Sequence, residues 1–365
     1  MDFYNVHVSQ SSIKFAKQVL ESTWISEGEM VKKFEEELSS QLRIINPVTV
    51  NSGTAALHLG LAIAGIKPGD EVILPAQTFV ATGLSILMQY AKPVFADIQL
   101  NTGNIDPNSI RSKITERTKA IMPVHWGGYP CDLDEINQIA KEYNLAVIED
   151  AAHALGATYK NNPIGSISRF TAFSFQAIKH VTTGDGGALC CLQDEDYKSA
   201  KKRRWFSIDR DSSKSSILGE RQYDIKELGY KYHLNDIGAA IGLGNLLDFS
   251  KRLKRRQEIG SIYRNELANV PGLELLEYKN DRTYSYWLFT ILVENRIKFI
   301  KKLKSQGIPT SVVHQGIDHN SIFGGKKEDL INQRRFDDKQ IAIPIHEELT
   351  DDEVDSIILT IKRGW

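Results

Sequence analysis

The segment Phe173-Ser-Phe-Gln-Ala-Ile-Lys-His-Val-Thr-Thr-Gly-Asp-Gly-Gly187 decides the architecture expected for this chain. It places Lys179 between a short aromatic run, typical of a buried strand, and a glycine-rich turn that leads back into the apolar run 188–192. The end of the turn faintly resembles a dinucleotide-binding loop, but it precedes a strand and not a helix, which argues against that interpretation. A lysine in a crowded apolar setting loses its proton more easily than one in water, as a nucleophilic amine must.

An acidic segment lies upstream, in Val147-Ile-Glu-Asp-Ala-Ala-His153. In a parallel sheet, Asp150 comes at the carboxyl end of a strand, which is the edge where ligands bind in open α/β sheets. A carboxylate there can keep a pyridinium nitrogen protonated and so make the ring an electron sink. His153 is near enough in sequence to reach the same ring. The competing interpretation is that Asp150 caps the next helix.

A possible phosphate site is found in Asn51-Ser-Gly-Thr-Ala-Ala56, between a strand and a helix. Small residues let the backbone approach a ligand, and a helix N-terminus presents free N–H groups to an anion. Ser174, five residues before Lys179, is a further candidate for binding a phosphate. An ordinary strand-to-helix turn with a Ser or Thr cap is the alternative.

Short apolar runs alternate with helical patterns through the first two-thirds of the chain, which predicts βαβ units and a parallel sheet covered on both faces. The strand-length runs there are 48–50, 71–74, 93–96, 119–124, 146–148, 170–175 and 188–192, and the C-terminal part adds the run 286–293. The expected helices include 132–143, 237–253, 297–306 and 351–362. Thr350 and Glu353 form a capping-box pattern at the start of the last of these.

The length of 365 residues favours two domains. We expect a large domain over residues 1–245, including the N-terminal segment, and a smaller C-terminal α/β domain over 246–365. The polar segment 209–222 interrupts the pattern and is either a linker or a mobile loop over a binding site.

Bulk properties exclude several classes of protein. The net charge of −1 is too low for a protein that neutralises many phosphates, so we expect no nucleic-acid partner. No apolar run approaches the roughly 20 residues of a membrane span, and the first ten residues lack a signal-peptide layout. Three cysteines without a C-x-x-C pair indicate a reduced, cytoplasmic protein. We expect no metal, because His314 and His319 lack a clear third ligand.

Taken together, these motifs resemble the DegT/DnrJ/EryC1/StrS family of PLP-dependent sugar aminotransferases over nearly the whole chain. Beyond the three segments above, the resemblance rests on Ser26-Glu-Gly-Glu29, Phe34-Glu35, Pro75 with Thr78-Phe79, Pro123-Val-His125, Gly229-Tyr-Lys-Tyr232 and Pro344-Ile-His346. It implies the aspartate-aminotransferase-like fold, fold type I, with a mixed and mostly parallel sheet in the large domain. It also implies pyridoxal 5'-phosphate (PLP) as the cofactor.

The resemblance implies a role for each matching residue. Lys179 is the catalytic residue, which bonds to PLP as a Schiff base and later moves the proton. Asp150 pairs with the pyridine nitrogen, and His153 lies near the phenolic oxygen. The remaining implied contacts, to the phosphate and the ring face, are made by Thr54, Ala55, Ser174 and Phe79.

The family's sites are shared between subunits, so the resemblance implies a homodimer. The segment Gly229-Tyr-Lys-Tyr-His-Leu-Asn235 matches the one that reaches the neighbour's phosphate, although Lys231 stands where Asn is usual. Lys231, His233 and Asn235 are therefore competing candidates for that contact, with Lys231 as the first choice. For the substrate, we expect contacts from Ser26, Arg210 and His314. The run 203–210 can grip a pyrophosphate, or it is only a solvated helix end.

The implied reaction moves an amino group from glutamate to a nucleotide-diphosphate 4-keto-6-deoxyhexose. The product is a 4-amino-4,6-dideoxy sugar nucleotide for glycan biosynthesis, such as that of lipopolysaccharide or O-antigen. Amination at C3 is the second choice. A family branch that removes a C3 hydroxyl carries His in place of the lysine, so Lys179 argues against it. A non-catalytic regulator with a PLP fold and a nucleotide-binding module without PLP stay as alternatives.

Overall fold

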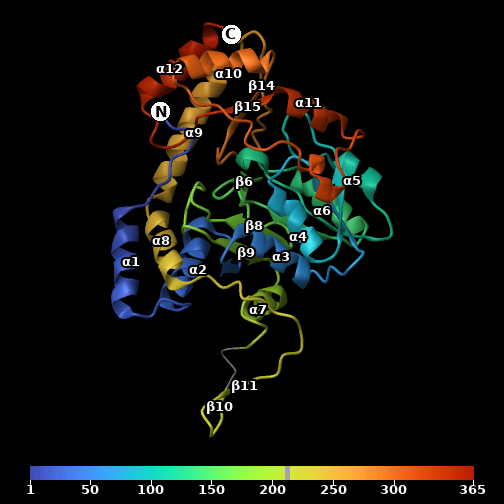
Figure 1. Ribbon diagram of the computed structural model, residues 1–365, viewed down its shortest axis with the longest axis vertical. Helices are drawn as coiled ribbons and strands as arrows, with labels where there is room; N and C mark the ends of the chain where they lie inside the picture. Colours follow the sequence, from blue (N-terminus) through green and yellow to red (C-terminus); the bar gives the residue numbers. More distant parts are fainter. Residues whose placement is uncertain (210–213) are drawn as a thin grey trace.

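The computed structural model describes residues 1–209 and 214–365. A seven-stranded sheet lies at the centre of the molecule (Figure 1). Its strands are β1 (Pro47–Val50), β2 (Glu71–Pro75), β3 (Lys92–Ala96), β4 (Thr118–Ile121), β5 (Ala146–Asp150), β8 (Phe170–Ser174) and β9 (Gly187–Cys191). Their order is β1-β9-β8-β5-β4-β2-β3, and β9 is antiparallel to both of its neighbours while the pairs from β8 to β3 are parallel. The sheet is thus mixed and mostly parallel, as predicted.

Helices cover both faces of this sheet. Successive side chains of a strand point to opposite faces, so Val147 of β5 packs into one core and Ile148 into the other. The first core contains side chains of α2 (Glu29–Leu42), α5 (Pro107–Lys113), α6 (Leu133–Glu142) and α8 (Asp236–Leu246). The second contains those of α3 (Gly53–Ile63), α4 (Val80–Met88) and α7 (Asp194–Arg203). Two buried faces explain why these strands are continuous apolar runs in the sequence.

A second, three-stranded antiparallel sheet lies in the C-terminal part, at the top of Figure 1. It is formed by β12 (Leu273–Leu275), β14 (Phe289–Val293) and β15 (Gln340–Ile343), and its neighbouring helices are α9 (Phe249–Leu267), α10 (Arg296–Ser305), α11 (Ile331–Lys339) and α12 (Asp351–Lys362). The predicted capping box of α12 is present: the Thr350 hydroxyl accepts the Glu353 N–H, and the Glu353 carboxylate accepts the Thr350 N–H. The predicted domain boundary between residues 245 and 246 stays a prediction.

The single helix predicted over 237–253 is wrong. The chain forms two helices there, because α8 ends at Leu246 and α9 begins only at Phe249. Asp248 between them has φ −110° and ψ 5°, outside the helical region. The apolar pattern runs on across this break, so periodicity alone does not reveal it.

The N-terminal residues cross from one part of the molecule to the other. Helix α1 (Gln10–Ser22) packs on α8, where the Ser12 hydroxyl donates to the Ile241 carbonyl at 2.8 Å. The residues before it lie against the C-terminal part: the Asp2 carbonyl is 3.1 Å from His346 Nε2, and the Met1 amino group is 3.9 Å from Glu353. The first few residues therefore run past the space between the two sheets.

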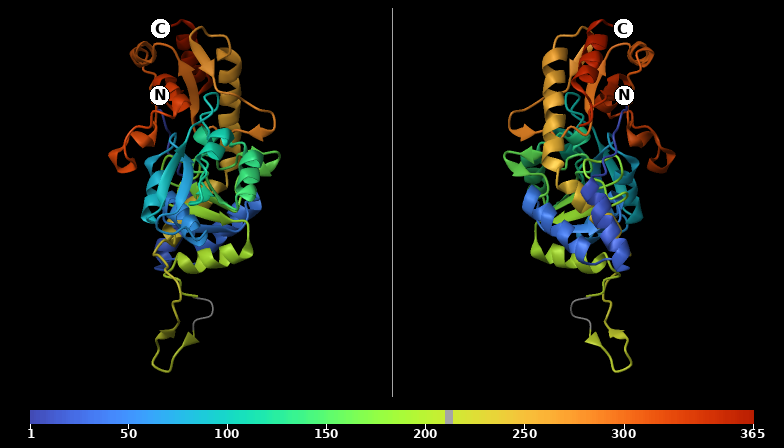
Figure 2. Two further views of the ribbon diagram at one scale, coloured as in Figure 1. Left: turned by 90° about the vertical axis from the view of Figure 1, so that its right-hand side faces the viewer. Right: turned by 90° about the vertical axis from the view of Figure 1, so that its left-hand side faces the viewer.

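A narrow arm projects from the body in every view (Figures 1 and 2). It carries the hairpin of β10 (Lys214–Ser215) and β11 (Arg221–Gln222), in the polar segment predicted to be a linker or loop. Ile217 and Leu218 at its tip are almost fully exposed.

A small separate sheet contains β6 (Thr158–Tyr159), β7 (Asn162–Pro163) and β13 (Arg282–Thr283). Within the described ranges, no helix is long and apolar enough to cross a membrane.

Candidate active site

A cavity of about 520 Å³ lies at the carboxyl edge of the central sheet. Seven of the residues predicted from sequence line it, and they come from five separate segments of the chain. They are Thr54, Phe79, Asp150, His153, Ser174, Lys179 and His314. The parallel strands account for this convergence, since β5 ends at Asp150 and β8 ends at Ser174 on the same edge.

Lys179 lies in the turn after β8, with its backbone N–H donating to the Gln176 carbonyl at 2.9 Å. Burial of the amine lowers the pKa of Lys179 to about 7, and the nearby Asp150 charge opposes part of that shift. Its Nζ lies 3.6 Å from the centre of the Trp287 ring. A sizeable fraction of this lysine is therefore a neutral amine at neutral pH, as imine chemistry requires.

The Asp150 carboxylate is fixed by two hydrogen bonds. Its Oδ2 accepts the Thr82 hydroxyl at 2.7 Å, and its Oδ1 accepts the Ala152 N–H at 3.1 Å. Burial raises the pKa of Asp150, against the lowering effect of these bonds and of Lys179. The residues after it form turns, so the alternative role as a helix cap is wrong. A buried carboxylate held this way suits a cationic ring nitrogen.

The N-terminus of α3 forms an anion cradle beside Ser174. The Ser52 hydroxyl caps the helix by accepting the Ala55 N–H at 3.0 Å, and the N–H groups of Gly53 and Thr54 come before any intrahelical acceptor is available. A Cβ on Gly53 would lie 3.0 Å from the Ser174 Cβ, and one on Gly187 would lie 2.7 Å from the Gly53 nitrogen. Only glycine allows this close approach of strand ends and helix start.

Aromatic rings form another wall of the cavity. The His153 ring stacks on Trp287 with centroids 3.7 Å apart, and Phe79 lies 5.1 Å from His314. Burial lowers the pKa of His314 to about 4 and that of His153 well below its usual value, so both imidazoles are neutral at pH 7. Among the described residues, none hydrogen-bonds the buried Nδ1 of His153. This orphaned atom can meet a polar group of a bound ligand.

The lining therefore fits PLP. It offers an amine for an aldehyde, a carboxylate for a ring nitrogen and a helix N-terminus for a phosphate. Ala55 does not line the cavity: its side chain is buried and its N–H donates to the Ser52 hydroxyl, so its predicted phosphate contact stays a prediction.

Two further predicted residues of the described chain, Ser26 and Lys231, do not line this cavity. Ser26 is exposed, and its carbonyl accepts the Asp236 N–H at 2.9 Å. Lys231 is exposed, with its Nζ 5.6 Å from the centre of the Trp205 ring. Arg210 lies outside the described residues.

The rival candidates for the contact with a neighbouring subunit have other local roles. The Asn235 side chain caps α8 by accepting the Gly238 N–H at 2.8 Å. The His233 ring packs edge-on against Trp205 at 4.3 Å.

Sequence reasoning missed three residues of the site. Tyr4 and Trp287 line the cavity, with their rings stacked 5.5 Å apart, and Thr82 bonds Asp150. Trp287 lies in the run 286–293, which we predicted to be a strand, but β14 begins only at Phe289. No sequence signal identifies Tyr4, since it comes from the N-terminal crossing.

Comparison with known proteins gives consistent matches. The model of the DegT/DnrJ/EryC1/StrS aminotransferase family matches residues 7–362. The spore coat polysaccharide biosynthesis protein SpsC of Bacillus subtilis is 38% identical over 97% of this chain and 94% of its own. The UDP-4-amino-4-deoxy-L-arabinose–oxoglutarate aminotransferase of Shewanella sediminis is 31% identical over 98% and 96%. The crystal structure of the sugar aminotransferase CalS13 from Micromonospora echinospora has a TM-score of 0.94 at 35% identity, over the full length of both chains.

Proposed function

Because the chain belongs to the DegT/DnrJ/EryC1/StrS aminotransferase family, we propose that it transfers an amino group from glutamate to a nucleotide-linked keto sugar. The predicted family, the fold type I architecture and the PLP cofactor are confirmed by this membership and by the match to a solved relative. The amino donor, the nucleotide and the sugar are the proposed part.

The observation that carries the proposal is one cavity lined by Lys179, Asp150 and the N-terminal residues of α3. Bound PLP supplies the electron sink and carries the amino group from donor to acceptor. The Lys179 amine is the attachment point and, with a pKa of about 7, can both remove and return a proton near neutral pH. Asp150 holds the proton on the ring nitrogen, and Thr54 with Ser174 binds the phosphate.

We place the reaction at C4 of a 4-keto-6-deoxyhexose attached to a nucleotide diphosphate. The Shewanella relative supports this choice, because its name joins a UDP-linked 4-amino-4-deoxy sugar to oxoglutarate, the keto form of glutamate. Amination at C3 is the alternative. The coat polysaccharide role of SpsC supports a use of the product in glycan biosynthesis, such as that of lipopolysaccharide or O-antigen. We propose the cytoplasm as the site of this reaction.

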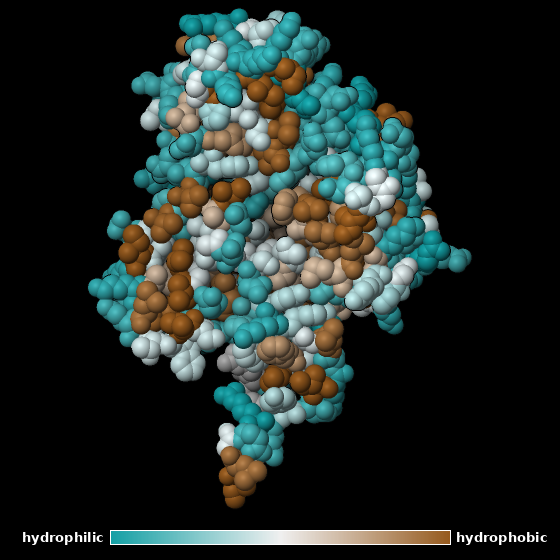
Figure 3. Space-filling view, in the orientation of Figure 1, coloured by the Kyte–Doolittle hydropathy of each residue, from teal (hydrophilic) through white to brown (hydrophobic). Residues whose placement is uncertain are grey.

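A homodimer with shared active sites is part of the proposal. Six apolar side chains of α1 and its flanks are about half exposed or more, and brown side chains gather over α1 in Figure 3. They are Val6, Val8, Ile13, Leu20, Trp24 and Ile25. A patch of this kind supports association with a second copy. In such a dimer we assign Lys231 to the neighbour's phosphate, since it is the exposed cation of its segment.

The test is the visible absorption of the purified holoenzyme. We expect a band that glutamate bleaches and a keto sugar nucleotide restores. Lys179→Ala should bind PLP without forming this band and should lose nearly all turnover. Lys226→Ala, which changes a well-exposed lysine that does not line the cavity, is the control and should behave as wild type. Wild-type turnover by the Lys179 variant would contradict the proposal.

A further inference from the structure

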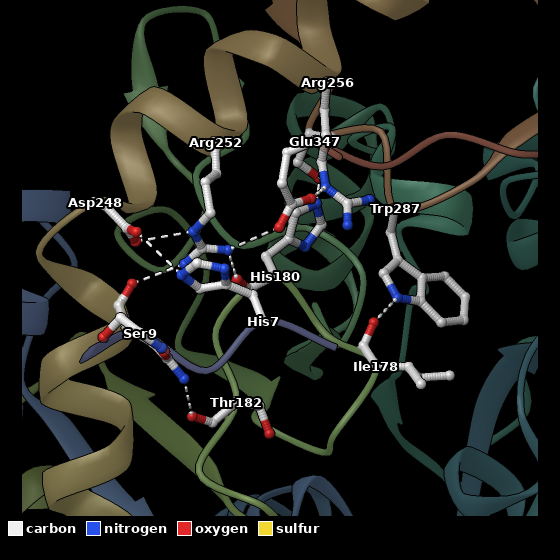
Figure 4. A network of polar contacts seen from close by, with 12 residues as sticks. His7, Ser9, Ile178, His180, Thr182, Asp248, Arg252, Arg256, Trp287 and Glu347 are labelled. Carbon is white, nitrogen blue, oxygen red and sulfur yellow. Dashed lines mark hydrogen bonds and ion pairs between the residues drawn. The ribbon is translucent and has the colours of Figure 1, made fainter. Parts of the chain in front are cut away.

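The backbone carbonyls of residues 178, 180 and 182, on both sides of Lys179, each accept a hydrogen bond from a side chain of another element. The Trp287 indole N–H donates to the Ile178 carbonyl at 3.0 Å. The Arg252 guanidinium donates to the His180 carbonyl at 2.7 Å, and the Asn245 amide donates to the Thr182 carbonyl at 3.0 Å. The donors come from α8, α9 and the segment before β14, so the turn that carries Lys179 is fixed from outside itself (Figure 4).

Of these three donor side chains, Arg252 makes the largest number of hydrogen bonds. Besides the His180 carbonyl, it donates to the Asn245 carbonyl at 2.7 Å, to Asp248 Oδ1 at 2.9 Å and to Glu347 Oε1 at 3.1 Å. The side chain is buried, with about 8% exposed. A guanidinium is planar and has its donors at fixed angles, so four acceptors define one position for it.

Glu347 couples this arginine to the C-terminal part. Its two oxygens bind Arg252 and Arg256, the latter at 2.7 Å, and these charges lower the pKa of Glu347 to about 2. Arg256 also donates to the carbonyls of Tyr286 and Ile345. Glu347 therefore stays charged at any working pH and fixes Arg252 relative to the second sheet.

The N-terminal crossing joins the same network. Asn245 Oδ1 accepts the Ser9 N–H at 2.9 Å, and Asp248 Oδ2 lies 3.0 Å from His7 Nε2. Figure 4 shows these contacts on the opposite side of Arg252 from Glu347. The turn that carries Lys179 is thus connected through one buried side chain to both ends of the chain.

We propose that Arg252 is a positioning residue for Lys179: it fixes the turn through the His180 carbonyl, and Glu347 fixes Arg252. The inference rests on the proposed attachment role of Lys179. Removing the guanidinium leaves the His180 carbonyl without its donor, and the amine can then shift from its reactive position. Misplacement of a reacting group by about 1 Å can lower a rate about a hundredfold.

The experiment compares Arg252→Met with Arg256→Met. Both variants remove a buried arginine of α9 that binds Glu347, so both should lower the melting temperature. Of these two arginines, only Arg252 donates a hydrogen bond to the turn that carries Lys179, within the described part of the chain. The readout is the rate at which PLP added to the apoprotein becomes attached to Lys179, trapped by borohydride reduction and located by peptide mass.

We expect attachment to slow by about tenfold to a hundredfold in Arg252→Met, with the rate in Arg256→Met near that of wild type. Equal rates in Arg252→Met and wild type, with lowered stability, would overturn the inference. Arg252→Lys keeps the buried charge and decides the question if the Met variant does not fold, because one ammonium cannot reach all four acceptors. It should attach PLP more slowly than wild type, and a wild-type rate would overturn the inference. Wild-type protein without label at Lys179 would instead contradict the proposed function.

Discussion

Thr82 donates its hydroxyl proton to Asp150, with Oγ1 and Oδ2 only 2.7 Å apart in a buried setting. The Thr78 hydroxyl, just before α4, lies 2.6 Å from that of Thr82, so two hydroxyls four residues apart in sequence lead to the carboxylate. Helix α4 therefore helps to hold the carboxylate that we propose for the cofactor's ring nitrogen. A hydrogen bond to the charged form of a carboxyl favours that form, which opposes the effect of burial.

Thr82→Val should weaken this control of Asp150. Valine has nearly the shape of threonine but no hydroxyl, so the pKa of Asp150 should rise above its already raised value. We expect turnover to fall about tenfold, which corresponds to a loss of about 1.4 kcal/mol of transition-state stabilisation. Steady-state kinetics with glutamate measure it. Ser85→Ala removes another buried hydroxyl of α4 and should leave turnover near wild type. Equal turnover in all three proteins would contradict this role.

The lowered pKa of Lys179 predicts a pH dependence for PLP uptake. Below pH 7 the amine is protonated and cannot attack, so the attachment rate should rise with pH and level off above a midpoint of about 7. Asp150→Asn removes the charge that raises this pKa and should move the midpoint lower. Stopped-flow absorbance of the apoprotein with PLP gives both curves. A rate that keeps rising toward pH 10 would indicate an ordinary, solvated lysine.

A contact of Lys231 with the neighbouring subunit can be tested by mixing two inactive variants. Lys179→Ala and Lys231→Ala homodimers should each have low activity, the second because it holds PLP weakly. A mixed dimer has one site with both native residues, so subunit exchange should restore activity in proportion to the mixed dimers formed. Asn235→Ala should instead act through the stability of α8. No recovery after proven exchange would contradict a contact across the interface.

Asp236 should be important for stability and not for chemistry. Its carboxylate accepts the N–H groups of Gly28, Met30 and Val31 at 2.8, 3.2 and 3.0 Å, where α2 has no side-chain cap of its own. Asp236→Ala should cost about 1–3 kcal/mol in the free energy of unfolding measured with urea. Asp224→Ala, at a well-exposed site, should change it by less than about 0.5 kcal/mol. A similar, small effect for both variants would show that α2 does not need this acceptor.

The sequence predicts those parts of the fold and site that depend on neighbouring residues. Apolar runs predict the strands of the central sheet. The segments 51–56, 147–153 and 173–187 all line the same cavity, because parallel strands align their carboxyl ends. The start of α12 is predicted to the residue, since the capping box of Thr350 is a local feature.

The missing parts depend on contacts between distant residues. No Pro marks the break between α8 and α9 in the sequence. Tyr4 reaches the cavity only because the N-terminal segment crosses the molecule. The contacts of Arg252 with the His180 carbonyl and with Glu347 join residues more than seventy positions apart, so neither periodicity nor motif spacing predicts them.

We propose that this chain aminates a nucleotide-linked keto sugar at the expense of glutamate. The most direct measurement supplies heavy-nitrogen glutamate with a panel of nucleotide 4-keto- and 3-keto-6-deoxyhexoses and follows the products by mass. We predict a sugar nucleotide that carries the heavy nitrogen at C4, formed by wild type and absent with Lys179→Ala. Conversion of glutamate to its keto acid with no nitrogen on any sugar in the panel would contradict the account.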